Sequence, residues 1–472
     1  MKRKIVAVLS TAALLTLGAS FTSMAATAGW VSSGSDWYYE KSNGERVEND
    51  WKKSGDFWYW LGEDGRMVKD SFVDDDGDFY YVDANGVMVT NTWKYLETEY
   101  TDGDMAWYFF GPNGKAIRKT GEKAKLYQIG TVKYIFNENG LMQYGWVNED
   151  GQMADPDDAE AWKDAVYYCG EDDSTGWIRT GWLKADVENT EDTDYQGYYW
   201  FYFNPVSGKK IVDNDGRQID GKRYGFDEHG VMLYEFANTS TSTPSNAVDG
   251  YKYYQDIDNG ANKRSGWFQA IPDEDINPDG YSDGDYKWFY ANSNGSLKVS
   301  QLASISGKKY AFNEYGERLA GLRGLELDSN NNIISYTDAA ESLSDIYAIE
   351  GDSKYEMYYF GDENDGAMRK KSQTIRLDDE TLHYEFLSTG AGKDGIVSGS
   401  IYTKGRRVEA DKEYGYEMFD INGNETVDIG SGYLVNTSGK IQKSKTNIKD
   451  KNDVYYCTDA EGLVTYKGYE KK

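Results

Sequence analysis

The chain has 472 residues, of which 80 are acidic and 51 basic, so its formal net charge is −29 and its sequence pI about 4.5. This acidity excludes nucleic acid and anionic membranes as partners, because both are bound through clustered Lys and Arg. Aromatic residues make up 15% of the chain, whereas all hydrophobic residues together reach only 39%. We therefore expect a folded protein, not a disordered one, whose core is built from aromatic rings.

The N-terminal residues 1–25 predict a secretory signal peptide. A basic start, Lys2 to Lys4, precedes an apolar stretch from Ile5 to Leu17, and small residues place the cleavage site near Ala25 or Ala28. The apolar stretch is too short to span a membrane comfortably, and the sequence shows no second one downstream. We therefore expect the mature chain to be secreted.

Residues 26–118 carry a regular repeat. Trp30, Trp51, Phe72 and Trp93 recur at one constant interval, and a glycine and a run of three aromatic residues repeat in step with them. Each unit contains an aromatic residue, a polar turn with glycine, the aromatic run, an Asn-Gly or Asp-Gly turn, and then Val or Met. Aromatic runs bounded by such turns predict short strands paired in β-hairpins.

Beyond residue 118 the repeat loosens but continues. Residues 119–320 hold degenerate units with long acidic inserts, such as 183–197 and 269–285, and residues 321–472 hold degenerate C-terminal units. A repeat architecture places such inserts as loops on one face, and we expect about fifteen hairpins in all. Because one hairpin cannot bury its aromatic face alone, the units must stack. The sequence therefore predicts an all-β fold, an elongated β-hairpin solenoid of about 20-residue repeats.

Strand parity separates two sets of side chains in the aromatic runs, because alternate residues of a strand face the same side. One register is aromatic in every unit, and we expect it to form the core. The register one residue earlier is aromatic in some units but Lys or Arg in others, which an obligatory core position would not allow. We therefore expect the aromatic residues of this variable register to be exposed or to line a groove. The core register comprises Tyr38, Tyr59, Tyr80, Tyr108, Tyr134, Phe201, Tyr224, Phe289, Tyr310 and Tyr358. The variable register comprises Trp37, Trp58, Phe79, Trp107, Trp200 and Trp288 in one class of unit, and Lys133, Arg223 and Lys309 in the other.

The sequence favours a protein that is not an enzyme and needs no cofactor. Its two histidines, His229 and His383, are not part of a catalytic or metal-binding motif, and paired carboxylates are uninformative in a chain with 80 acidic residues. Two cysteines exclude a disulfide scaffold. Both Cys169 and Cys457 fall on the core parity, which favours buried apolar residues over reactive thiols.

One acidic insert matches the opening of a calcium-binding loop. Asp275, Asn277 and Asp279 supply oxygen atoms at the first, third and fifth positions, and Gly280 follows. The twelfth position, where a glutamate should close the site, is Tyr286. A solvated acidic loop is therefore favoured over a calcium site, and these three residues are the weak candidate for a metal.

Where two units meet, the indole after the glycine and the indole of the strand can form a shallow cage. Such a cage suits a quaternary ammonium ion, held by cation–π attraction of about 0.5 to 2 kcal/mol per contact. The net negative charge of the chain raises the local concentration of such a cation.

The segments GWVSSGSDWYYEKSNGERV, WKKSGDFWYWLGEDGRMV and FVDDDGDFYYVDANGVMV, which begin at Gly29, Trp51 and Phe72, resemble the cell-wall-binding, or choline-binding, repeats of Gram-positive surface proteins. The resemblance implies cages made by the Trp after Gly, the first aromatic residue of the strand and an aromatic residue of the following unit. The implied junctions use Trp30, Trp37 and Trp51, and then Trp51, Trp58 and Phe72. The ligand-binding residues would be Trp30, Trp37, Trp51, Trp58, Phe72, Phe79, Trp93 and Trp107.

The leading hypothesis is a non-catalytic secreted protein, attached non-covalently to the Gram-positive cell wall, that recognises choline on teichoic acids. Two alternatives remain open. One is a glucan- or polysaccharide-binding repeat protein, in which the exposed aromatic residues stack on sugar rings. The other is a surface adhesion scaffold whose acidic loops contact host proteins. The oligomeric state stays undetermined at this level.

Overall fold

The computed structural model describes residues 27–188, 197–240, 243, 245–257, 264–377 and 379–472. The predicted signal peptide, residues 1–25, lies outside the described residues. The described chain is almost entirely β, with 35 strands and two short helices, and its strands form fifteen separate sheets, all antiparallel where their register is recorded. The predicted all-β hairpin fold is confirmed.

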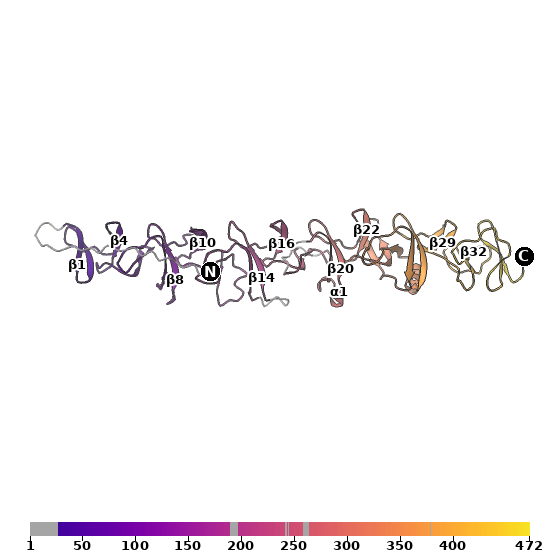
Figure 1. The fold of residues 1–472 in the computed structure, drawn as a ribbon, viewed down its shortest axis with the longest axis horizontal. Helices are drawn as coiled ribbons and strands as arrows, with labels where there is room; N and C mark the ends of the chain where they lie inside the picture. The colour runs from indigo at the N-terminus through magenta and orange to yellow at the C-terminus, as the bar shows by residue number, and fades with distance from the viewer. Residues whose placement is uncertain (1–26, 189–196, 241–242, 244, 258–263, 378) are drawn as a thin grey trace. The chain divides into compact units, whose positions relative to one another are not determined.

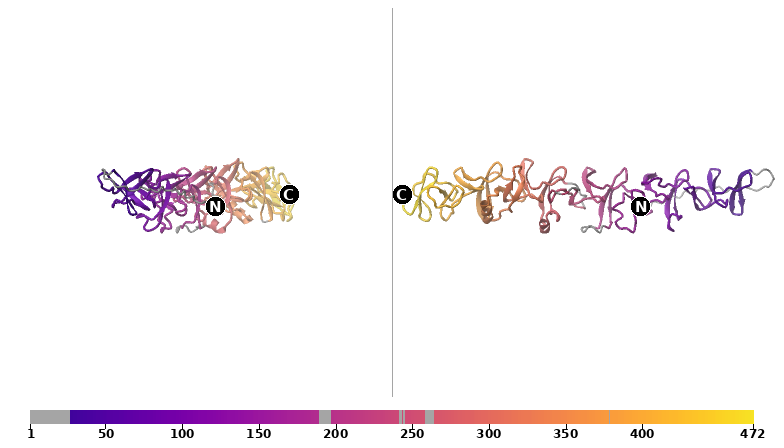
Figure 2. Two further views of the ribbon diagram at one scale, coloured as in Figure 1. Left: turned by 60° about the vertical axis from the view of Figure 1, so that its left-hand side comes forward. Right: turned by 180° about the vertical axis from the view of Figure 1, so that it is seen from behind.

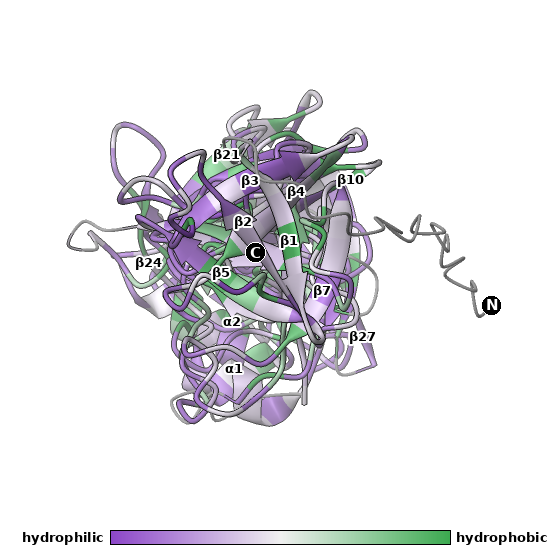
Figure 3. Cartoon of the chain, turned by 90° about the vertical axis from the view of Figure 1, so that its left-hand side faces the viewer, coloured by the Kyte–Doolittle hydropathy of each residue, from purple (hydrophilic) through white to green (hydrophobic). Residues whose placement is uncertain are grey.

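The chain divides into two compact units. Unit 1 comprises Met1–Asp215 and Phe226–Met232, and unit 2 comprises Gly216–Gly225 and Leu233–Lys472. Within each unit the hairpins follow one another in chain order (Figures 1 and 2). The loops that join them are mostly hydrophilic (Figure 3).

Unit 1 consists of two-stranded hairpins. Their pairs are β1 (Gly29–Ser33) with β2 (Asp36–Glu40), β3 (Asp50–Ser54) with β4 (Phe57–Leu61), β5 (Ser71–Asp75) with β6 (Asp78–Val82), β7 (Thr92–Leu96) with β8 (Ala106–Phe110), β9 (Leu126–Ile129) with β10 (Val132–Ile135), β11 (Trp146–Val147) with β12 (Tyr167–Tyr168), and β13 (Gly181–Ala185) with β14 (Tyr199–Phe203). A further hairpin, β15 (Asn214–Ile219) with β16 (Lys222–Phe226), contains the division between the units.

Unit 2 combines hairpins with larger sheets. Its two-stranded hairpins are β17 (Phe236–Asn238) with β18 (Tyr251–Tyr253), β19 (Gly266–Ala270) with β20 (Lys287–Ala291), β21 (Gln301–Ile305) with β22 (Lys308–Phe312), and β31 (Tyr416–Phe419) with β32 (Tyr433–Asn436). One three-stranded sheet has the order β24 (Ile333–Tyr336), β23 (Leu322–Leu327), β25 (Glu356–Tyr359), and another β33 (Ile448–Lys449), β34 (Tyr455–Thr458), β35 (Val464–Gly468). The five-stranded sheet has the order β26 (Lys371–Leu377), β27 (Glu380–Phe386), β30 (Arg406–Arg407), β29 (Ser400–Thr403), β28 (Gly395–Val397).

The two helices lie in stretches without a clear repeat unit. Helix α1 (Pro278–Asp283) occupies part of the insert 269–285, where a loop was expected, and helix α2 (Leu343–Gly351) precedes β25. The Asn277 side chain caps α1, while Ser342 begins α2 with a capping box. No helix of the described residues is long and apolar enough to cross a membrane.

A main-chain hydrogen bond links successive hairpins. At most of the turns, the residue two positions after the glycine donates its N–H to the carbonyl of the residue that begins the corresponding run in the preceding hairpin. Met67 donates to the Trp37 carbonyl at 2.8 Å, and Met88 donates to the Trp58 carbonyl at 2.9 Å. We call the donor the linking residue and the place where two hairpins meet the junction. The other junctions used below have Ala116, Met142, Lys210, Met232, Arg318 and Met368 as linking residues.

At several turns the glycine makes room for the linking residue of the previous junction. A Cβ atom at Gly114 would lie 2.5 Å from the sulfur of Met88, and Gly114 also has a φ of +79°. Only glycine combines that conformation with that space. The glycine period of the sequence therefore marks the contact between neighbouring hairpins as well as the turn.

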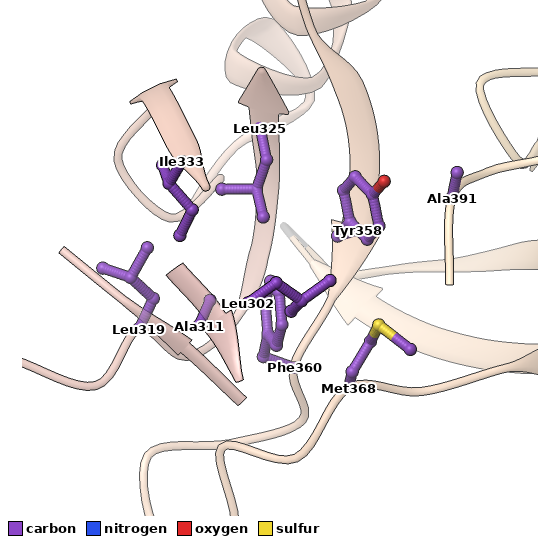
Figure 4. Close-up of a cluster of buried hydrophobic side chains, with 9 residues drawn as sticks. All are labelled: Leu302, Ala311, Leu319, Leu325, Ile333, Tyr358, Phe360, Met368 and Ala391. Carbon is purple, nitrogen blue, oxygen red and sulfur yellow. The ribbon is translucent and has the colours of Figure 1, made fainter. Parts of the chain in front are cut away.

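The core register behaves as predicted for most of its members. Eight of its ten residues are buried, whereas Tyr59 and Tyr134 are half-buried. Part of unit 2, however, has an aliphatic core, in which Leu302, Leu325 and Ile333 pack around Phe360 (Figure 4). The expectation of an aromatic core is therefore correct for the regular hairpins but not for this part of the chain.

Candidate aromatic ligand sites

The first two junctions of the regular hairpins are each built around a Trp that is the second residue of the hairpin's first strand. Cross-strand pairing places Trp51 opposite Trp60 of its own hairpin, with ring centroids 5.2 Å apart, and the same indole lies 5.0 Å from Tyr80 of the next hairpin. Trp30 makes the equivalent contacts with Tyr39 at 5.5 Å and Tyr59 at 5.3 Å. The ring contacted across each of these junctions therefore belongs to the core register of the following hairpin.

In the described part of the chain, three junctions bring two indoles together at nearly a right angle. Trp93 and Trp107 have centroids 6.3 Å apart and an interplanar angle of 85°. The ring centroids of Trp182 and Trp200 lie 6.2 Å apart with an interplanar angle of 87°. Those of Trp267 and Trp288 lie 6.3 Å apart with an interplanar angle of 83°. We call each pair an indole corner. The aromatic faces of such a pair can attract a cation from two directions.

A cavity of about 1160 Å³ opens at the junction of Trp51 and Trp58, and Tyr80 and Met88 also line it. The Trp51 indole is oriented by a hydrogen bond that its Nε1 donates to Asp75 at 3.1 Å. Burial raises the pKa of Tyr80, so its hydroxyl is neutral at physiological pH. Trp58 is 41% exposed and its ring is open to solvent.

The charged groups of this cavity are mainly acidic. Asp50, Asp56 and Asp83 line it, together with the cation of Lys94. Carboxylates beside aromatic faces favour a ligand that is positively charged and carries apolar groups. A quaternary ammonium ion has both properties.

The structure places the predicted site residues unequally. Trp51 and Trp58 line the cavity, and Trp93 and Trp107 form an indole corner. Trp30 packs at the first junction. There the carbonyl of the half-buried Trp37 accepts the hydrogen bond from the linking residue. These six residues therefore all lie at junctions.

Phe72 and Phe79 differ from the other predicted residues, because their junction is filled. Phe79 is only 5% exposed, so the expectation that it is exposed or lines a groove is wrong. The loop between β7 and β8 lays Tyr100 against both rings, at 6.2 Å from Phe72 and 5.2 Å from Phe79. The Arg118 guanidinium lies 5.1 Å from the Phe79 centroid. The loop of the next hairpin therefore fills the space at this junction.

Sequence reasoning missed the tyrosines and methionines of the junctions. Tyr59, Tyr80 and Tyr134 were assigned only to the core register, although each also contacts the Trp of the preceding hairpin. Met67 and Met88 occupy the same position of the repeat, two residues after the turn glycine. This regularity could have identified them from the sequence.

The remaining candidate groups have structural roles. The Asn277 side chain accepts a hydrogen bond from Gly280 N at 3.1 Å as the cap of α1, and its Nδ2 donates to Glu317 at 2.7 Å. Asp275 and Asp279 flank this cap, and no group of three or more His, Cys, Asp or Glu side chains in the described chain is placed to hold a metal ion. Cys169 and Cys457 are buried and unpaired, as predicted.

The sequence and the structure were compared with known proteins. Residues 48–93 match the family model of the choline-binding repeat. No curated protein matches the chain. The matched segment includes Trp51, Trp58, Tyr80 and Met88, so it covers the junction at which the cavity opens.

Several solved structures are similar to the chain. One is the modular autolysin LytC from Streptococcus pneumoniae in complex with a synthetic peptidoglycan ligand, at 19% identity and a TM-score of 0.35 over 64% of this chain and 56% of that one. Choline binding protein F from the same organism has 18% identity and a TM-score of 0.27 over 82% of this chain and all of that one. The choline binding domain of Spr1274 in S. pneumoniae has 27% identity and a TM-score of 0.16 over 20% of this chain and all of that one.

The chain thus spans a little over half of the LytC structure. The resemblance seen in the sequence motifs is confirmed by the family model, which falls on the most regular hairpins and on the cavity between them. The described chain is therefore a β-hairpin protein, and its residues 48–93 match the choline-binding repeat.

Proposed function

We propose that the chain is a secreted, non-catalytic protein that attaches to the Gram-positive cell wall by binding choline on teichoic acids. The observation that carries this proposal is the cavity of Trp51, Trp58, Tyr80 and Met88, which lies inside the segment that matches the choline-binding repeat. The indole corner of Trp93 and Trp107 follows at a later junction and offers a second site of the same chemistry.

The chemistry of the cavity selects a quaternary ammonium over other cations. Such an ion has no N–H to donate and carries methyl groups, so it loses little hydration when it moves onto an aromatic face. Each contact with a ring contributes about 0.5 to 2 kcal/mol. The carboxylates of Asp50, Asp56 and Asp83 add a favourable local field.

Repetition of weak sites is suited to a polymer. One shallow cage binds a single choline weakly, but several cages on one chain can bind neighbouring choline groups of the same polymer at high effective concentration. Attachment to a choline-bearing polymer therefore needs neither a covalent bond nor a deep pocket.

The proposal is tested by retention of the full chain on a choline resin. We expect the wild-type chain to be retained and to elute with free choline, and the double variant Trp51→Ala, Trp58→Ala to elute at a lower choline concentration. Tyr286→Ala is the matched control, because this ring is 67% exposed and lies outside the junctions described above. A wild-type chain that passes through the resin without delay contradicts the proposal.

Polysaccharide binding is the second candidate, and the rim of the same cavity favours it. Phe57 and Trp58 are 45% and 41% exposed next to each other, and exposed rings of this kind can stack on sugars. Retention on dextran that free choline does not reverse would favour this function over choline binding.

A further inference from the structure

At two junctions the linking residue is itself a cation that lies on aromatic rings, and the first is Lys210. Its ammonium lies 5.5 Å from the centroid of Trp146, 5.9 Å from Trp162 and 5.9 Å from Phe201. The residue is only 7% exposed, and its Nζ donates hydrogen bonds to the carbonyls of Trp162 at 2.8 Å and Lys163 at 3.1 Å. Three aromatic rings and two carbonyls therefore surround one internal ammonium.

The second internal cation is Arg318, at the indole corner of Trp267 and Trp288. The centre of its guanidinium lies 5.8 Å from the first indole and 5.3 Å from the second. Nη1 donates to the carbonyl of Asp365 at 3.2 Å, and Nη2 donates to the carbonyl of Glu363. The guanidinium is therefore held at the corner by hydrogen bonds as well as by the two rings.

The segment that accepts these hydrogen bonds is itself fixed by ion pairs. The Asp365 carboxylate lies 3.5 Å from Lys308 and forms an ion pair with Arg369. The same segment turns at Gly366, whose Cα faces the guanidinium so closely that a Cβ there would clash with it. The turn of the following hairpin is shaped around the arginine side chain.

Lys210 and Arg318 occupy the position that methionine occupies at the open junctions. The N–H of Lys210 donates to Val166 O at 2.7 Å and that of Arg318 to Trp288 O at 2.7 Å. At the cavity and at the first indole corner, the same bond is made by Met88 and Met142, both at 2.9 Å. The indole corners with Met142 and with Arg318 have the same ring separation, 6.3 Å, and nearly equal interplanar angles, 85° and 83°.

We propose that the linking residue decides whether a junction can take an external quaternary ammonium. Where aromatic rings line a junction, a methionine at the linking position leaves them open to the ligand, whereas Lys210 and Arg318 act as internal ligands that permanently occupy theirs. This inference rests on the proposed function and deepens it, because it assigns which junctions of the chain are binding sites.

Two physical effects exclude an external cation from an occupied junction. A second positive charge at the same rings would be repelled and would find the ring faces already covered. The internal cation also loses no translational freedom when it binds, because the chain already holds it in place. A weakly bound external ligand cannot compete with it.

The test is a count of bound choline per full chain by isothermal titration calorimetry. Arg318→Met should add one site to the wild-type number, because it leaves the corner of Trp267 and Trp288 empty. Met88→Arg should remove one site, because it supplies a guanidinium to the cavity of Trp51 and Trp58. Arg179→Met is the matched control, since Arg179 lies 4.7 Å from the ring of Trp177 but is not a linking residue, and it should leave the number unchanged.

The outcomes separate this inference from the proposed function. If the wild-type chain binds choline and folded Arg318→Met and Met88→Arg chains both keep the wild-type number, the inference is overturned and the proposed function stands. If the wild-type chain and both variants bind no choline, both are overturned. If only Arg318→Met binds choline, the inference holds and the proposed function fails. If circular dichroism shows that Arg318→Met does not fold, the number of bound choline molecules is measured for Lys210→Met and Met88→Arg instead. Lys210→Met should then add one site and Met88→Arg should remove one.

Discussion

The regular hairpins of residues 29–118 and the part of unit 2 between residues 302 and 391 are linked in the same way but filled differently. In the first region the core around Tyr108 and Phe110 is aromatic, whereas in the second Leu302 and Leu325 provide much of the core. The linking bond is nevertheless retained, because Met368 donates to Lys309 O at 2.8 Å in the second region. The backbone linkage therefore does not depend on which side chains fill the core.

The proposed ligand surface depends on different residues from those that maintain the fold. In the first region the accepting carbonyl belongs to Trp58, whose ring also lines the cavity, whereas in the second region it belongs to Lys309 or Met357. The main-chain bond is the same, but the aromatic face is missing. Folding is therefore carried by the linking bond and the core register, whereas the proposed ligand surface needs the rings of the variable register as well as a suitable linking residue.

The largest expected effect is the loss of a core ring. Phe360→Ala removes a fully buried side chain just after β25 and should lower the opening free energy of the sheet of β23, β24 and β25 by about 3 to 5 kcal/mol. Trp58→Ala, at a 41% exposed position, should change the opening free energy of the hairpin of β3 and β4 by about 1 kcal/mol or less. Native-state hydrogen exchange of the neighbouring amides measures both. Equal losses would contradict the separation of fold from binding.

The second effect concerns a buried ion pair present in the C-terminal region. Arg406 on β30 donates two hydrogen bonds to Glu350 on α2, at 2.7 and 2.8 Å, and both side chains are largely buried. Glu350→Ala leaves the guanidinium unpaired and should cost about 3 to 5 kcal/mol. Glu45→Ala, which removes the exposed partner of Lys41, is the control and should leave the melting temperature unchanged. A comparable drop in both variants would show that burial does not set the difference.

The third effect is a pH dependence at the junction of Lys210. Burial lowers the pKa of this lysine from 10.5 to about 8, so the folded chain loses the proton at lower pH than the unfolded chain. Between these values the unfolded state binds more protons, and stability therefore rises with pH. Relative to Lys210→Met, the wild-type chain should gain about 3 kcal/mol from pH 7 to pH 10.5. Urea denaturation of both chains at several pH values checks it, and a flat difference would mean that burial leaves the lysine pKa unchanged.

The smallest effect is chemical and leaves the fold unchanged. Burial raises the pKa of the Cys169 thiol to about 12, so almost no thiolate forms at pH 8. In a Cys457→Ser chain, a thiol reagent should label Cys169 only after denaturant is added. Rapid labelling of the folded chain would show that the hairpin of β11 and β12 opens readily.

The hairpins and their core register could be predicted from the sequence, because both depend on a constant repeat interval and on strand parity. The closure of Phe79 could not be predicted, since it depends on where the loop carrying Tyr100 comes to rest. The shared position of Lys210 and Arg318 can be read from the sequence, because each follows its turn glycine by two residues, as Met88 does. The aromatic rings on which their charges lie could not be predicted, because these rings come from other strands and loops.

The insert 269–285 was expected to be a loop throughout, but part of it forms α1, because one pattern serves two purposes. The oxygen atoms of Asp275, Asn277 and Asp279 have the spacing of a calcium loop. An asparagine followed by proline also begins a helix, however, and Asn277 caps α1 in this way.

The signal peptide, the domain boundaries and the assignment of ligand-binding residues stay predictions.

The linking bonds also imply how the chain responds to a pulling force. Because each hairpin is joined to its neighbour by its own linking bond and ring contacts, tension applied at the two ends should detach hairpins one after another. Each regular repeat, about 20 residues long, would release about 70 Å of contour length. Force spectroscopy of the chain should therefore record a staircase of similar small steps, and a cell held by such a tether would have its load relaxed gradually before the tether broke.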